Sequence, residues 1–98
     1  MNTKFKMWSL YPFITRDIAL WVSEGTSVEK VKEVIKDNAG ELLIKGPELF
    51  DAFKKQDKVS YAFRLVFQSY ERTLTDAEVN EIMNKIGEKI KKQGWRVR

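Results

Sequence analysis

The chain has 98 residues, 43% of them hydrophobic and 33% charged, and its 18 Lys and Arg outnumber its 14 Asp and Glu for a formal net charge of +4. This length fits one domain, and the composition is typical of a folded protein, which excludes an intrinsically disordered one. The sequence contains neither His nor Cys, so disulfides and thiolate metal sites are excluded and an enzyme is disfavoured.

Residues 1–10 are interpreted as an N-terminal lead-in to a domain that occupies residues 11–98. The lead-in has no uninterrupted apolar stretch of signal-peptide length, and no apolar run in the chain approaches the roughly 20 residues of a membrane-spanning helix. We therefore expect a cytoplasmic protein without membrane contact. Pro12 keeps the residue before it extended, so the first strand is expected to begin later.

The first strand is predicted over residues 17–23, where apolar side chains alternate with period two. Ile18, Leu20 and Val22 fall on one face of this strand, and Ala19 and Trp21 fall on the other. This pattern indicates a strand with one face against a core.

A helix is predicted over about residues 27–39. Thr26 and Glu29 have the spacing of a capping box, and the valines and isoleucine that follow recur at helical spacing. Gly40 is expected to end this helix in the left-handed conformation.

An interrupted edge strand is predicted next, in two apolar pieces at residues 42–44 and 49–53. Pro47 lies between them, and proline cannot donate to a sheet ladder. Residues 54–58 are interpreted as a polar hairpin connection. Residues 59–68 alternate again, with an aromatic and aliphatic series expected in the core and Ser60, Ala62, Arg64, Val66 and Gln68 on the other face.

The second helix begins after a further capping box, formed by Thr75 and Glu78. Its apolar stripe is Val79, Ile82, Met83, Ile86 and Ile90. The lysines of its later half are interpreted as a solvated face. Gly94 is expected to end the helix, and residues 95–98 to form a short last strand with Arg96 and Arg98 pointing outward.

The predicted order of elements is strand, helix, strand, strand, helix, strand. This order predicts an α+β fold of the ferredoxin-like βαββαβ type, a four-stranded antiparallel sheet with both helices on one face. The other face then combines an indole with arginines and small side chains, a composition that suits single-stranded RNA.

The predicted RNA contacts are Trp21, which would stack on a base, Gln68, which would read a base edge, and Arg64, Arg96 and Arg98, which would hold the phosphate backbone. Phe50 and Arg72 are further candidates. Trp21 has an alternative role, because it could instead pack against Phe5 or Trp8 of the lead-in. Arg72 could instead brace the loop before the second helix, and Asp17 is expected to cap a backbone group or to pair with Arg16 or Arg72.

Four segments together resemble the ferredoxin-fold anticodon-binding domain. They are residues 11–12 with 16–20, residues 48–51, residues 60–68 and, most specifically, residues 72–80. They follow the order of the family and cover the chain from about Tyr11 to its end.

The resemblance implies the C-terminal domain of a phenylalanyl-tRNA synthetase beta subunit, which contacts the anticodon region of phenylalanine tRNA. It implies no catalytic centre, metal or cofactor in this domain. Aminoacylation with ATP and magnesium would belong to the full ligase, in the alpha subunit that the rest of the beta chain binds. The alternative is a small-molecule-sensing or protein-docking module of the same fold that does not bind RNA.

Overall fold

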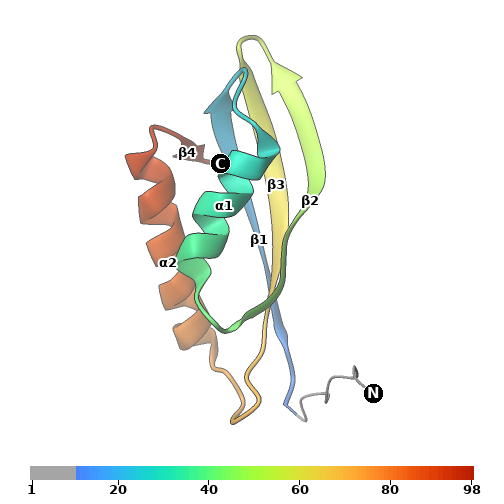
Figure 1. The fold of residues 1–98 in the computed structure, drawn as a ribbon, viewed down its shortest axis with the longest axis vertical. Coiled ribbons are helices and arrows are strands. Elements are labelled where there is room, and N and C mark those ends of the chain that lie inside the picture. The colour runs from blue at the N-terminus through green and yellow to red at the C-terminus, as the bar shows by residue number, and fades with distance from the viewer. Residues whose placement is uncertain (1–10) are drawn as a thin grey trace.

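The computed structural model describes residues 11–98 and shows a four-stranded antiparallel sheet in the order β2-β3-β1-β4. Both helices lie on one face of this sheet (Figure 1), so the predicted ferredoxin-like α+β fold is confirmed. The elements are β1 (Ile14–Ser23), α1 (Val28–Ala39), β2 (Leu43–Lys55), β3 (Lys58–Phe67), α2 (Asp76–Lys92) and β4 (Arg96–Val97). The predicted lead-in, 1–10, lies outside the described residues. Neither helix is long and apolar enough to cross a membrane.

The hydrophobic core fills the space between the helices and one face of the sheet. The alternation of β1 and β3 sets this arrangement, because Leu20, Phe63, Leu65 and Phe67 all have no exposed surface. The helices contribute Val31, Ile35, Val79, Ile86 and Ile90 from their inner faces. The faces that were predicted from the sequence for β1 and β3 are therefore confirmed.

The two helices begin at different kinds of cap. For α2 the predicted capping box is confirmed: Thr75 Oγ1 accepts from the Glu78 N–H at 3.2 Å, and a Glu78 carboxylate oxygen accepts from the Thr75 N–H at 2.9 Å. For α1 the predicted box was wrong by one residue. Ser27 is the cap, because its extended backbone lets its Oγ accept from the Lys30 N–H at 3.1 Å.

The edge strand β2 is irregular where proline interrupts the pattern. It forms one strand with three register shifts, and the two pieces expected from the sequence are joined through Gly46 and a cis Gly46–Pro47 peptide. Gly46 has φ of 97°, and a Cβ added there would overlap the carbonyl oxygen of Arg64. Only glycine fits this close approach between β2 and β3 without strain.

The β2–β3 hairpin is tighter than expected. The predicted connection of residues 54–58 reduces to Gln56 and Asp57, because Lys55 and Lys58 are already paired across the two strands. Gln56 takes φ of 56° to close the turn. The hairpin extends past the N-terminal end of α1 (Figure 1), and its last residues are solvent-exposed.

Candidate nucleic-acid interface

The sheet face opposite the helices, called the open face below, has small side chains along its middle. In the register of the sheet, Ser60 of β3 lies between Trp21 of β1 and Phe53 of β2. The two rings meet edge to face, with centroids 5.4 Å apart. Ser60 is only 1% exposed.

Arg98 completes this aromatic group. Its backbone N–H donates to the Ala19 carbonyl at 2.8 Å, and its Nη1 donates to Ser60 Oγ at 2.6 Å. Its guanidinium carbon lies 5.1 Å from the Phe53 ring centroid and 5.9 Å from that of Trp21. We call Trp21, Phe53, Ser60 and Arg98 the aromatic cluster.

The cluster bears on the two roles considered for Trp21. Among the described residues its ring contacts Phe53 and Arg98, and part of it remains exposed. Phe5 and Trp8, the partners of the alternative role, lie outside the described residues. The contacts with Phe53 and Arg98 hold the indole in a defined position, as a stacking surface requires.

Arg64 and Phe50 also lie on the open face, where the row of Ala19, Ala62 and Asp51 separates Arg64 from the cluster. Arg64 makes two hydrogen bonds to Asp17, Nε to Oδ1 at 2.9 Å and Nη2 to Oδ2 at 3.1 Å. Its guanidinium carbon is 4.8 Å from the Phe50 ring centroid. The partner predicted for Asp17 was therefore wrong: Arg16 points to the helix side, where it pairs with Asp76 of α2 at 3.1 Å.

The Asp17–Arg64 pair makes folding stability depend on pH. The hydrogen bond from Arg64 holds the pKa of Asp17 below its ordinary value, and partial burial opposes that shift only in part. A carboxyl whose pKa is lower in the folded state stabilises the fold above its unfolded pKa of about 3.9. That contribution is lost as pH falls through the folded pKa.

We expect Asp17→Asn to lower the free energy of unfolding slightly at pH 7, because both side chains are about half exposed. The difference from wild type should shrink at pH 3, because this pH lies below the unfolded pKa of about 3.9 and protonation of Asp17 in the unfolded chain removes part of the contribution. Urea unfolding at the two pH values measures this. A difference that stays constant or grows in acid would contradict the assignment.

Arg96 lies on the same part of the open face, where β4 pairs it with Trp21. Within residues 11–98 neither Arg96 nor Arg98 forms an ion pair. Their charges are thus available to an anionic ligand, whereas the charge of Arg64 is matched by Asp17.

Two predicted contacts lie elsewhere in the structure. Gln68 follows β3 at the far end of the sheet from Trp21, and its Nε2 donates to the Tyr11 carbonyl at 2.6 Å. Arg72 forms an ion pair with Glu78 in the first turn of α2, the bracing role considered for it. The structure brings Trp21, Arg96 and Arg98 together but leaves Gln68 and Arg72 apart from them.

Sequence reasoning missed three open-face residues, Phe53, Lys55 and Lys58. Phe53 and Lys55 are two residues apart in β2, so period-two alternation could have predicted that they lie on the same face. Assigning residues 54–58 to a loop hid that pattern for Lys55 and Lys58.

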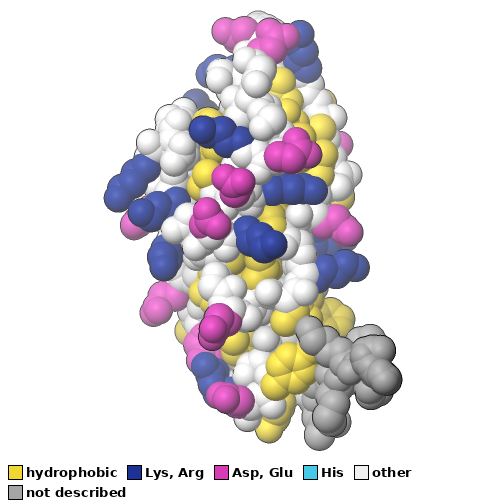
Figure 2. All heavy atoms as spheres, viewed as in Figure 1, with side chains coloured by type: hydrophobic (Ala, Val, Ile, Leu, Met, Phe, Trp, Pro, Cys, Tyr) yellow, Lys and Arg dark blue, Asp and Glu magenta, His cyan; other side chains and the backbone are white. Residues whose placement is uncertain are grey.

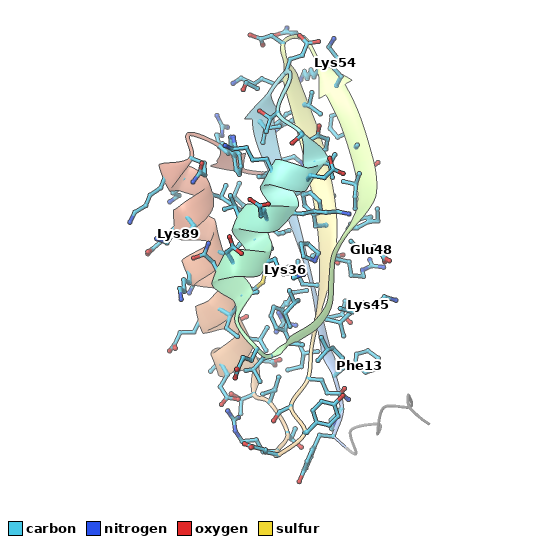
Figure 3. All side chains as sticks on the ribbon, in the orientation of Figure 1. Phe13, Lys36, Lys45, Glu48, Lys54 and Lys89 are labelled. Carbon is cyan, nitrogen blue, oxygen red and sulfur yellow. The ribbon has the colours of Figure 1, made fainter. Side chains whose placement is uncertain are left out.

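The helix side of the molecule has a different charge pattern. Figure 2 shows Lys and Arg interspersed with Asp and Glu over this face. Lys36 of α1 and Lys89 of α2 are on this side (Figure 3). No group of three or more acidic side chains able to hold a metal ion occurs between residues 11 and 98.

Comparison with known proteins gives a consistent result. A family model described as "Ferredoxin-fold anticodon binding domain" matches residues 9–98. The chain is 37% identical over 95 residues to a chloroplastic/mitochondrial phenylalanine–tRNA ligase of Arabidopsis thaliana, a match that covers 95% of this chain and 22% of that protein.

Bacterial relatives give similar matches. The chain is 40% identical over 90 residues to a phenylalanine–tRNA ligase beta subunit of Trichormus variabilis, covering 88% of this chain and 11% of the relative. It is 46% identical over 77 residues to the corresponding subunit of Corynebacterium diphtheriae, covering 74% and 9%. The chain thus spans between about a tenth and a fifth of the length of these relatives.

Proposed function

Because the chain belongs to the ferredoxin-fold anticodon binding domain family, we propose that it binds the anticodon region of phenylalanine tRNA through the open face of its sheet. The observation that supports this most is the position of Arg96 and Arg98. Both lie beside the exposed part of Trp21 and have no carboxylate partner among the described residues. An indole and guanidinium groups without an ion-pair partner are the side chains that bind unpaired bases and their phosphates.

In this proposal the predicted contacts have different roles. Arg96 and Arg98 supply unmatched positive charge for phosphates, and Trp21 supplies a surface for a base. Arg64 has a different role in this proposal: held by Asp17 and lying over the Phe50 ring, it offers the flat face of a guanidinium for stacking.

In the parent protein, we propose, this domain belongs to a phenylalanine–tRNA ligase. The relatives whose names indicate this activity are several times longer than the present chain. Aminoacylation with ATP and magnesium would then take place outside this domain, in the alpha subunit of a two-subunit enzyme. The role of this domain would be to position the anticodon arm.

The proposal predicts strongly salt-dependent binding. We expect the domain to bind a stem-loop RNA with the anticodon arm of phenylalanine tRNA weakly, because phosphate contacts dominate such interfaces. Arg96→Gln should reduce the slope of log K against log salt by about 0.7, the value for one contact to single-stranded RNA. Titration by fluorescence anisotropy at several salt concentrations measures this slope.

Lys85→Gln is the matched control, since it removes one exposed positive charge from α2 on the opposite side. The proposal fails if Arg96→Gln and Lys85→Gln change the slope equally, or if the wild-type domain does not bind the stem-loop. A protein-docking or small-molecule-sensing module would show no such binding.

A further inference from the structure

The hairpin end of the open face contains a pocket of about 250 Å³. It is lined by Trp21, Lys55, Gln56, Lys58 and Arg96. These residues come from β1, the β2–β3 hairpin and β4, so the pocket depends on the pairing of all four strands. The pocket adjoins the aromatic cluster, because Trp21 belongs to the cluster and also lines the pocket.

Two of the lining residues are positively charged and lie opposite each other. Lys55 and Lys58 are directly paired across β2 and β3, an arrangement that destabilises a sheet unless an anion lies between the charges. The acidic residues at this end do not supply one. Glu24 forms an ion pair with Lys54, and Asp57 forms no ion pair within residues 11–98.

The pocket thus combines an aromatic ring with three cations, Lys55, Lys58 and Arg96, that have no ion-pair partner in the described chain. A flat apolar ring beside concentrated positive charge matches one chemical unit, a nucleotide, whose base stacks and whose phosphates are anionic. Inorganic anions would use the cations alone and would have no use for the face of the indole.

We infer that this pocket is a subsite for one unpaired nucleotide of the bound loop, with its base on Trp21 and its flanking phosphates on Lys55, Lys58 and Arg96. The inference rests on the proposed function, since it assigns part of the same RNA to a defined place. It also predicts that one loop position contributes more to binding than its neighbours.

The test is a thermodynamic cycle with stem-loop RNAs in which each loop nucleotide in turn is made abasic. At one position, loss of the base should weaken binding to the wild-type domain about fivefold or more. The same abasic RNA should bind Trp21→Ala as well as the unmodified RNA does, because the stacking partner is already absent.

A second variant keeps the test independent of any effect of Trp21→Ala on folding. Lys55→Gln with Lys58→Gln removes two facing charges from exposed positions, and it should reduce the slope of log K against log salt by about 1.4. The control is Lys85→Gln with Lys92→Gln, two exposed lysines of α2, which should leave the slope unchanged.

The inference is overturned if every abasic substitution weakens Trp21→Ala as much as wild type, or if the two double variants have equal slopes. In either case the unmodified stem-loop still binds, so the broader function survives. If the wild-type domain binds no stem-loop at all, the function and the subsite both fall.

Discussion

A Gly46→Ala variant is expected to lose about 2–4 kcal/mol of unfolding free energy. Gly46 has φ of 97°, a conformation that costs an L-residue about 1–3 kcal/mol. The added Cβ would also overlap the backbone carbonyl of Arg64 on β3, and backbone cannot move aside as a flexible side chain can. β2 would have to separate from β3 where Lys45 pairs with Val66 and Glu48 with Arg64.

Gly87→Ala is the matched control, and its effect should have the opposite sign. Gly87 lies within α2, and apart from the neighbouring backbone of the helix itself a Cβ added there would meet no atom within 4 Å. Alanine favours a helix interior over glycine by about 0.5–1 kcal/mol, so this variant should be more stable than wild type. Urea unfolding of the three proteins measures both effects. Equal midpoints for Gly46→Ala and wild type would refute the close approach of β2 to β3.

Trp21→Ala is expected to weaken binding of the unmodified anticodon stem-loop by about 5- to 150-fold. This range corresponds to the roughly 1–3 kcal/mol that stacking of a base on an aromatic side chain contributes. Trp21→Phe should recover part of the loss, because a smaller ring still offers a stacking face. The same titration by fluorescence anisotropy, at one fixed salt concentration, measures the three affinities.

Phe13→Ala provides the control for this prediction. Phe13 is 62% exposed and precedes β1, at the other end of the sheet from Trp21 (Figure 3). It therefore tests whether removing any exposed aromatic ring has the same effect. An affinity lowered equally by Phe13→Ala and Trp21→Ala would contradict the placement of the base on Trp21.

The fold could be predicted from the sequence because its signals are local. Strict alternation along Tyr61, Phe63, Leu65 and Phe67 assigns a buried face without knowledge of any other strand. The capping box at Thr75 marks the start of α2 in the same way. The cap of α1 predicted at Thr26 was wrong by one residue, because the Ser27 hydroxyl is the one that accepts from the N–H of Lys30.

The candidate site was less predictable because its contacts depend on register. Asp17 and Arg64 are 47 residues apart and meet only because β1 and β3 pair them directly. The alternation of residues 59–68 predicted that Arg64 lies on the open face. It could not predict that Asp17 pairs with Arg64 and balances its charge. Lys55 and Lys58 became neighbours through a turn of two residues, and turn length is set by backbone geometry that polar composition does not reveal.

The irregular outer edge of β2 also affects how the protein behaves at high concentration. An edge strand with unpaired N–H and C=O groups can add a strand from another molecule, which is a common route to aggregation. Here Pro47, three register shifts and a lysine at position 45 disrupt that edge. The edge of β2 is therefore a poor template for intermolecular β-pairing, and we expect no association through it at the high concentrations that weak RNA binding requires.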